Sequence, residues 1–413
     1  MSTSLVHDHD SGEGLVPVEE ARERVLSQIK PLQPLELPLQ EAEGCVLAQD
    51  VVASSDIPDF ASSAMDGFAV RSSDVAGATP ASPVELRIVG RALMGQRPES
   101  TVGGGESVRI ATGAPVPAGA DAIVPIENCE VVGDTVRVLA ASPGGKHIRP
   151  TGEDVKGGEV LLPVGRRLGA PELGLLATAG SSHPLVHPRP RVVVLSTGDE
   201  LIAPGQSPEY GQIRDSNAYL LFGALREAGA VPMMAGIVRD EVEDLKDRVL
   251  SHLVQADAFI SSGGVSVGER DVVKAAFFKR GELDFYKVAM QPGMPQGAGT
   301  VYGVPTITLP GNPVSALVSF EVFLRAPLRA AMGAVPPERS RRSAVLTEKL
   351  TSPRGKRQFR RGVFDPATDE VTSYGPPASH HLRWLASANC LLEIPEDTHE
   401  LPAGSRVDLW DLR

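Results

Sequence analysis

Three short apolar runs are each followed directly by glycine together with hydroxyl, acidic or amide side chains. The runs and the residues after them are 192–195 with Ser196, Gly198 and Glu200; 258–260 with Ser262, Gly263, Gly264 and Ser266; and 306–309 with Pro310, Gly311, Asn312 and Pro313. If the runs are parallel strands, these residues lie along one edge of a sheet, where open α/β folds bind ligands. Glycine lets the backbone approach a phosphate, and a helix that starts after the strand offers free N–H groups to it. The sequence therefore predicts a phosphate-binding edge.

Acidic residues accompany two of these strand ends. Asp199 and Glu200 are adjacent, and two neighbouring carboxylates repel each other unless a cation or a donor joins them. Asp271 follows the second glycine cluster at an expected helix start, where the helix dipole alone also favours an acid. Because Mg²⁺ commonly bridges carboxylates to substrate phosphates, we expect a magnesium site beside the phosphate-binding edge.

Three loops in the first half of the chain also present polar side chains. Asp66 stands in Ser-Ala-Met-Asp-Gly, Thr112 in a glycine- and proline-rich loop over 111–117, and Asp154 in Gly-Glu-Asp at 152–154. Taken one at a time, each loop is also explained by a solvated turn or a plain structural loop. Local pattern leaves both interpretations open.

Basic residues gather at two places. Lys287 precedes Gln291-Pro-Gly-Met294-Pro, and a stretch of cations comprises Arg354, Lys356, Arg357, Arg360 and Arg361. That stretch is equally compatible with a solvated strand. A histidine pair at 380–381 has no third metal ligand near it in sequence, and no Ser/His/Asp or Cys/His arrangement is recognisable.

The elements expected around these residues form an α/β fold of several domains. Helical periodicity covers 18–29, 216–228, 241–254, 271–279 and 313–330, with a short helix near 41–46 and further strands near 232–237 and 285–290. Alternating helices and strands after residue 191 predict βαβ units and a parallel sheet, hence a three-layer α/β domain. Short β runs over 56–150 and over the last ~75 residues predict an inserted, mostly β domain and a C-terminal barrel or sandwich.

The domain boundaries follow from these patterns. We expect a disordered tail at 1–14, a discontinuous N-terminal linker domain at 15–55 and 151–186, and the inserted β domain at 56–150. The α/β domain is expected at 187–333 and the C-terminal domain at 338–413, after Pro336-Pro337.

Composition narrows the class of protein. A net charge of −12 argues against a nucleic-acid partner. No apolar run approaches ~18 residues, so we expect no membrane partner and a cytoplasmic location. The three cysteines are far apart, which argues against a zinc site or a disulfide framework.

Six motifs together resemble one family. Ser-Ala-Met-Asp-Gly, Thr-Gly-Ala-Pro-Val-Pro, Gly-Glu-Asp, Ser-Thr-Gly-Asp-Glu-Leu, Ser-Gly-Gly-Val-Ser-Val-Gly and Leu-Pro-Gly-Asn-Pro-Val-Ser-Ala occur in the order seen in molybdopterin molybdenumtransferases, the MoeA family that includes the carboxyl half of gephyrin. The resemblance covers about residue 18 to the end. It implies a linker region, an inserted β domain, a molybdopterin-binding α/β domain and a C-terminal β-barrel. It also implies an elongated homodimer with a site shared between protomers.

The resemblance further implies an activity and a set of site residues. The activity is insertion of molybdenum from molybdate into adenylylated molybdopterin, with Mg²⁺ as cofactor and AMP as the released product. Positions that match polar family residues of catalysis or of metal and substrate binding are Asp66, Thr112, Asp154, Glu200, Asp240 and Asp271, of which Asp66, Glu200 and Asp271 are the expected metal ligands. Lys287 matches a lysine of the cleft, and Arg361 and Ser379 match C-terminal residues that face it.

The chain departs from the family pattern at Gln291 and Met294, where many relatives carry lysines. Two cations are thereby removed from a site expected to hold an oxyanion, and we expect the basic stretch at 354–361 to compensate. Two other functions remain open. One is the related molybdopterin adenylyltransferase, which needs only the α/β domain. The other is a gephyrin-like scaffold that binds the peptide tail of a partner protein.

Overall fold

The computed structural model describes residues 14–263, 272–277 and 283–412. Nearly all of the expected disordered tail, 1–14, lies outside these residues. The chain divides into two compact units, which are described separately. The first comprises Met1–Ala48, Gly165–Gly169 and Leu185–Arg413, and the second comprises Gln49–Val164 and Ala170–Pro184.

A six-stranded sheet forms the centre of the first unit, in the order β17-β14-β18-β22-β21-β19. Its strands are β14 (Arg191–Thr197), β17 (Val231–Val238), β18 (Ala258–Ser262), β19 (Leu283–Lys287), β21 (Pro295–Val301) and β22 (Val304–Leu309). The first four strands in spatial order are parallel, whereas β21 and β19 run antiparallel to their neighbours. The expectation of a wholly parallel sheet is therefore wrong at this edge, because a tight turn joins β21 directly to β22 without a crossover helix.

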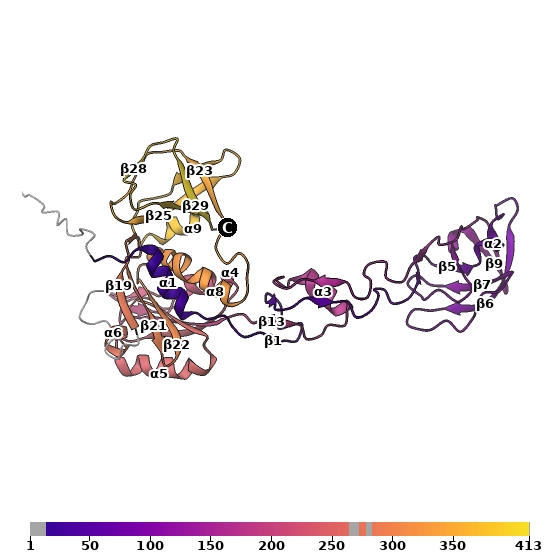
Figure 1. The fold of residues 1–413 in the computed structure, drawn as a ribbon, viewed down its shortest axis with the longest axis horizontal. Coiled ribbons are helices and arrows are strands. Elements are labelled where there is room, and N and C mark those ends of the chain that lie inside the picture. The colour runs from indigo at the N-terminus through magenta and orange to yellow at the C-terminus, as the bar shows by residue number, and fades with distance from the viewer. Residues whose placement is uncertain (1–13, 264–271, 278–282, 413) are drawn as a thin grey trace, which may run out of the picture. The chain divides into compact units, whose positions relative to one another are not determined.

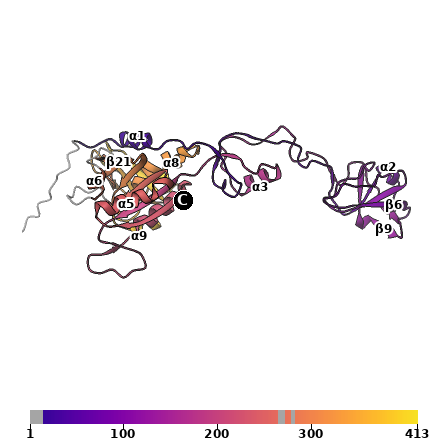
Figure 2. The same ribbon diagram turned by 90° about the horizontal axis from the view of Figure 1, so that it is seen from below.

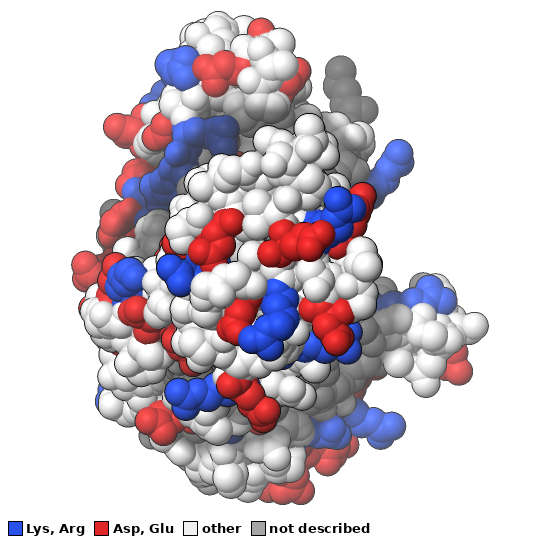
Figure 3. All heavy atoms as spheres, turned by 90° about the vertical axis from the view of Figure 1, so that its right-hand side faces the viewer, with Lys and Arg blue, Asp and Glu red and all other residues white. Residues whose placement is uncertain are grey.

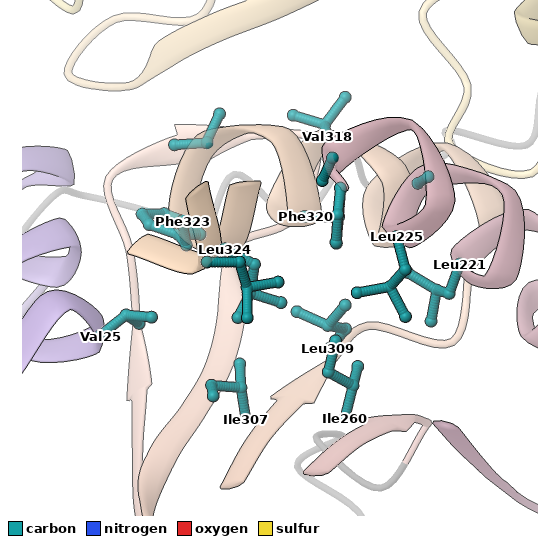
Figure 4. Packing of buried hydrophobic residues seen from close by; sticks show 14 of the residues in the cluster. Val25, Leu221, Leu225, Ile260, Ile307, Leu309, Val318, Phe320, Phe323 and Leu324 are labelled. Atoms are coloured by element: carbon teal, nitrogen blue, oxygen red, sulfur yellow. The ribbon is translucent and has the colours of Figure 1, made fainter. Parts of the chain in front are cut away.

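Helices cover both faces of this sheet, as the expected three-layer α/β arrangement requires (Figures 1 and 2). The helices are α1 (Val18–Gln28), α4 (Asn217–Ala228), α5 (Val242–His252), α6 (Val272–Phe277), α7 (Pro313–Ser319) and α8 (Arg325–Ala331). Apolar side chains of α1, α4, α7 and α8 share one buried cluster with the sheet, and part of this cluster is drawn in Figure 4. Side chains of α5 and α6 form a second cluster with Val193, Leu195 and Phe259. The alternation of the two clusters along β14 follows from the opposite directions of successive strand side chains.

The expected helix at 313–330 is interrupted rather than continuous. A π-helical turn, Phe320–Leu324, separates α7 from α8. Its Phe320 and Phe323 are almost fully buried and point into the core in Figure 4. Such turns often lie near functional sites.

A closed five-stranded barrel follows the α/β part of the first unit and confirms the expected C-terminal barrel. Strands pair in the ring β25-β26-β23-β29-β27, and β25 and β27 close it. The elements of this region are β20 (Met290–Gln291), β23 (Arg341–Leu346), β24 (Leu350–Thr351), β25 (Arg357–Asp365), β26 (Glu370–Ser373), α9 (Leu382–Ser387), β27 (Cys390–Ile394), β28 (Glu400–Leu401) and β29 (Arg406–Asp411). Because β20 pairs with β25, the segment after β19 is attached directly to the barrel.

The remaining short strands of the first unit are β1 (Leu35–Glu36), β2 (Val46–Leu47), β13 (Leu185–His187), β15 (Leu201–Ile202) and β16 (Ile213–Arg214). No helix forms at 41–46, contrary to the expectation. Residues 39–44 are mainly turns and end at Gly44 with φ 79°, a conformation that stops a helix.

The second unit is built on a six-stranded sheet in the order β8-β5-β7-β6-β10-β9. Its elements are β3 (Val51–Val52), β4 (Ser62–Ser63), β5 (Gly67–Val70), α2 (Ser72–Val75), β6 (Val84–Ala92), β7 (Glu106–Ile110), β8 (Ala122–Pro125), β9 (Cys129–Val132), β10 (Thr135–Val138), β11 (Ile148–Arg149), β12 (Val160–Leu162) and α3 (Ala170–Thr178). Phe68 and Val70 of β5, which lies between β8 and β7, are fully buried in the core of this unit.

The surface carries charges of both signs. Acidic and basic side chains are interspersed on the face drawn in Figure 3. In the part of the chain that the structure describes, no helix combines the length and apolar character that a membrane span requires.

Candidate active site

A cleft of about 530 Å³ opens at the carboxyl ends of β18 and β22 in the first unit. The two strand ends are joined by a hydrogen bond from the Gly263 N–H to the Leu309 carbonyl, 3.0 Å. The cleft is lined by Gly263, Gln291, Pro292, Gly293, Met294, Pro295, Pro310, Gly311, Asn312, Ser315, Pro377, Ala378 and Ser379. Two of the three predicted strand ends thus line one cavity, and the barrel supplies its opposite wall.

Glycine is required by geometry at two of the strand ends. Gly198 has φ 150°, and a Cβ there would lie 2.5 Å from a carboxylate oxygen of Glu200. Gly263 has φ 91°, and a Cβ there would lie 3.1 Å from the Thr197 carbonyl oxygen. Gly263 therefore lets the end of β18 approach the end of β14, whereas Gly198 adopts a backbone conformation that side chains disfavour.

Asn217 joins two of the strand ends, and sequence reasoning missed it. Its Nδ2 donates to the Ser262 Oγ at 2.9 Å and to the Gly311 carbonyl at 2.6 Å. Asn217 is 7% exposed, and it opens α4 just after Asp215, whose carboxylate accepts the Ala218 N–H. An amide side chain at a helix start, next to a capping acid, was the signal that could have identified it.

The turn before α7 is tied to the barrel loop at Ser379. Asn312 Nδ2 donates to the Ser379 Oγ at 2.8 Å, and the Val314 N–H donates to the Ser379 carbonyl at 3.0 Å. Pro313 has no N–H, so the first two residues of α7 offer no free donor to an anion. The expectation that this helix start binds a phosphate through its first N–H groups is corrected accordingly.

Two of the five cations in the basic stretch are committed to partners within the protein. Arg361 is 4% exposed and donates to the carbonyls of His381, at 3.0 Å, and Pro376. Arg357 binds the carboxylates of Glu19, Glu393 and Glu396. Arg361 therefore holds the loop that carries Ser379, and a direct contact between Arg361 and substrate stays a prediction.

Neutral side chains occupy the two positions where many relatives carry lysine. Gln291 and Met294 both line the cleft, and Gln358 Nε2 donates to the Gln291 Oε1 at 2.9 Å. Lys287 is exposed at the end of β19 opposite Pro295, but it is not among the residues that line the cleft. The described wall of this cleft thus carries no lysine or arginine.

Carboxylates gather at the end of β14. The Asp240 N–H donates to the Asp199 carboxylate at 3.2 Å. Burial, and then repulsion by Asp199 and Glu200, raises the pKa of the Asp240 carboxyl above its usual value. This repulsion is what a cation would relieve. Ser196, in contrast, is fully buried within β14, so its hydroxyl does not reach the cleft.

Among the described residues, no group of three or more His, Cys, Asp or Glu side chains is arranged to hold a metal ion. The rings of His380 and His381 pack against each other, with centroids 4.3 Å apart, in keeping with the structural interpretation of that pair. Gly264, Ser266 and Asp271 lie outside the described residues. The expected ligation by Asp271 therefore stays a prediction.

The second unit brings Asp66 and Thr112 together. The Asp66 carboxylate accepts the Thr112 N–H at 2.7 Å, although the two residues are 46 positions apart. Both side chains are exposed. Asp154 is also exposed, and its N–H donates to the Ile57 carbonyl at 3.1 Å, in a separate part of this unit. Convergence of Asp66 with Glu200 stays a prediction, because they belong to different units.

The fold and the cleft define a multidomain α/β protein with a cleft at its strand ends. Comparisons with known proteins give its family. Models of the MoeA N-terminal region (domain I and II), a "probable molybdopterin binding domain" and the MoeA C-terminal region (domain IV) match residues 16–180, 193–330 and 343–412.

Relatives match over nearly the whole chain. Molybdopterin molybdenumtransferase 2 of Mycobacterium tuberculosis is 50% identical over 96% of this chain and 99% of its own length. Molybdopterin molybdenumtransferase 1 of the same organism is 36% identical over 95% and 98%. The crystal structure of a molybdopterin biosynthesis MoeA protein from Pyrococcus horikoshii superposes with a TM-score of 0.76, at 30% identity, covering 97% of this chain and 99% of that one. The chain belongs to the MoeA family, a family of enzymes of molybdenum cofactor biosynthesis.

Proposed function

We propose that this enzyme inserts molybdenum from molybdate into adenylylated molybdopterin and releases AMP. The observation that carries the proposal is the glycine-rich cleft of about 530 Å³ at the ends of β18 and β22. Its volume is within the range of small-molecule sites. Relatives of this chain are named molybdopterin molybdenumtransferases, which supports the same substrate class.

The backbone of the strand ends is the surface that would take the phosphates. Gly263 and Gly311 bring no side chain into the cleft, so a phosphoanhydride can approach the main chain closely. Asn217 fixes Gly311, and Ser379 fixes Asn312, through the hydrogen bonds described above. The site is thus held in shape before substrate binds, which reduces the entropic cost of binding.

The carboxylates after β14 fit a magnesium ion of the kind the proposal needs. Burial, and then repulsion by Asp199 and Glu200, raises the pKa of Asp240. These three carboxylates do not form a closed three-ligand site, but Mg²⁺ is usually bound by one or two carboxylates, with substrate phosphates and water as its other ligands. A bound Mg²⁺ would supply charge neutralisation at the phosphate oxygens.

Arg361 supports the cleft through the loop that it holds, and Gln291 lines the cleft directly. Arg361 holds the loop of Ser379 in place against the turn before α7. Gln291 presents a neutral amide where a cation would grip an oxyanion more strongly. We therefore propose weaker attraction for molybdate in this chain than in relatives with lysine there.

The proposal includes a cytoplasmic homodimer in which Asp66 and Thr112 of the second unit complete the site. The support is the hydrogen bond from the Thr112 N–H to the Asp66 carboxylate, which brings together two exposed loops that are far apart in the sequence. Sedimentation at micromolar concentration is expected to give twice the chain mass of 43.6 kDa. A species of single-chain mass alone would contradict the shared site.

AMP release with and without molybdate tests the activity. In anaerobic incubations with adenylylated molybdopterin and Mg²⁺, we expect AMP to form in a molybdate-dependent manner. Formation of adenylylated molybdopterin from ATP would instead indicate an adenylyltransferase. Absence of both reactions, together with binding of a partner's peptide tail, would indicate a scaffold.

A further inference from the structure

A second cavity of about 390 Å³ lies in the first unit, between α1, the π-helical turn, α8 and the start of the barrel. It shares no lining residue with the strand-end cleft. Leu26, Phe323, Pro327 and Trp410 give it apolar walls, and Figure 4 shows Phe323 on the side of the core that faces α1. Nothing in the proposed reaction uses this cavity.

Arg325, in the cavity wall, is buried without full hydrogen bonding. It is 9% exposed, and neither its Nε nor its Nη1 has a hydrogen-bond partner. The nearest carboxylate, Glu321, accepts two hydrogen bonds from Arg339, at 2.7 and 2.9 Å, and lies 3.9 Å from the Arg325 Nε. Glu321 is therefore committed mainly to Arg339. Buried guanidinium groups are normally paired, so unsatisfied donors beside an apolar cavity point to a missing anionic partner.

Arg22 of α1 presents a second incompletely paired guanidinium to the same cavity. Its Nε donates to the Val322 carbonyl of the π-helical turn at 3.2 Å, while its Nη2 is buried without a partner. Burial lowers the pKa of both Arg22 and Arg325, and the nearby carboxylates of Glu393 and Glu321 oppose this shift. Glu23, Glu321, Glu338, Arg339 and Arg341 also line the cavity. Arg339 and Arg341 are paired with Glu321 and Glu393, so Arg22 and Arg325 are the lining arginines that have buried donors without a partner.

We infer that this cavity is a second ligand site, for a small organic carboxylate with an apolar or aromatic body. The carboxylate would accept hydrogen bonds from Arg325, since charge-assisted contacts of this kind are strong. The apolar body would pack against Phe323, Pro327 and Trp410, and burial of its surface would add to the affinity. The occupant is a small molecule because the cavity volume is at the lower end of the range for such sites.

Calorimetry on the full-length protein tests this site with 4-phenylbutyrate and with its neutral amide as probes. We expect saturable binding of the carboxylate at one site per chain. The affinity for the amide should be lower than that for the carboxylate by roughly tenfold or more. Adenylylated molybdopterin should not displace the carboxylate, because the two cavities are separate. Absence of saturable carboxylate binding, or equal affinity for acid and amide, would overturn the inference.

Three variants assign the binding to the cavity. Arg325→Met removes the charge at similar volume and should weaken carboxylate binding roughly tenfold or more, while Arg329→Met, in the same helix but outside the cavity wall, should leave it unchanged. Ala330→Trp fills the cavity from an exposed position and should abolish binding even if Arg325→Met fails to fold. Unchanged affinity in Ala330→Trp would overturn the assignment. So would conversion of a dimer to a monomer by that substitution, because a second copy of the chain would then occupy the cavity.

Discussion

Restoring lysine at the two neutral positions of the cleft is expected to strengthen molybdate use. Gln291→Lys with Met294→Lys places two ammonium groups in the cleft wall that now carries no described lysine or arginine. From the sequence alone, the basic stretch at 354–361 was expected to compensate, so that the double substitution would matter little. The structure argues against that expectation, because none of the five cations lines the cleft, and two of them, Arg357 and Arg361, are already bound to carboxylates and backbone carbonyls.

The size of the effect follows from distance and exposure. A unit charge about 5 Å from an ammonium group interacts by roughly 0.8 kcal/mol at the dielectric constant of water and roughly 3 kcal/mol at an effective value near 20. Gln291 is exposed and Met294 half-buried, so the lower end applies. Two lysines facing a dianion then contribute about 3 kcal/mol in total, roughly a 200-fold decrease in the KM for molybdate.

The assay is initial AMP release at varied molybdate and saturating Mg²⁺, at two ionic strengths. Salt should reduce the gain, because the new charges are accessible to solvent. The matched control is the neutral exchange Gln291→Met with Met294→Gln, which should leave the KM within about twofold. A double-lysine KM within twofold of the wild-type value would refute the reasoning, because cations elsewhere would then already hold the oxyanion.

Three further substitutions test other parts of the site. Asp66→Ala should lower AMP release about 100-fold if the carboxylate contributes charge to the metal site. Asp66→Asn can still accept the Thr112 N–H but lacks the charge, so it should lose nearly as much activity. Wild-type rates in the Asn variant would exclude a role for the charge. The folded-state pKa of Asp240 is raised, so its ionised carboxylate destabilises the fold above that pKa. Asp240→Asn should therefore raise the Tm at pH 8 in the presence of a chelator, and this gain should disappear below about pH 4, where the wild-type carboxyl is protonated in both states. An equal or lower Tm of the variant at pH 8 would contradict the repulsion. Arg361→Ala should cost about 3 kcal/mol of local stability and raise the KM, since two hydrogen bonds from a buried cation are lost; unchanged thermal unfolding would show that the loop does not depend on it.

The sequence predicted most of what forms the strand-end cleft. Apolar runs bounded by glycine located β14, β18 and β22, because a buried parallel strand needs a continuous apolar stretch and its end must turn sharply. Residues 295–301 were not recognised as a strand, since Pro-Gln-Gly-Ala-Gly-Thr-Val has weak strand propensity. There Gly297 is needed for close packing, as a Cβ would lie 2.2 Å from the Thr308 Oγ1.

Roles that depend on three-dimensional contacts were beyond the sequence. Asn217 joins strand ends that are far apart in the chain, and its place at a helix start beside Asp215 marks it as a capping position but does not show which strand ends it reaches. In the sequence Arg361 looks like one of five surface cations. In the structure its guanidinium is buried against backbone carbonyls of a loop whose position could not be predicted from the sequence. The motif order did identify the family, because six matches in order constrain the chain far more than any one loop does.

The ratio of molybdenum incorporated to AMP released, in a single anaerobic turnover, tests the central claim most directly. The enzyme would be mixed with limiting adenylylated molybdopterin, Mg²⁺ and molybdate, and the pterin fraction analysed for metal while AMP is quantified. We predict one molybdenum atom bound to pterin for each AMP released, and no AMP without molybdate. AMP release that proceeds equally without molybdate, or without metal in the pterin fraction, would contradict the proposed coupling.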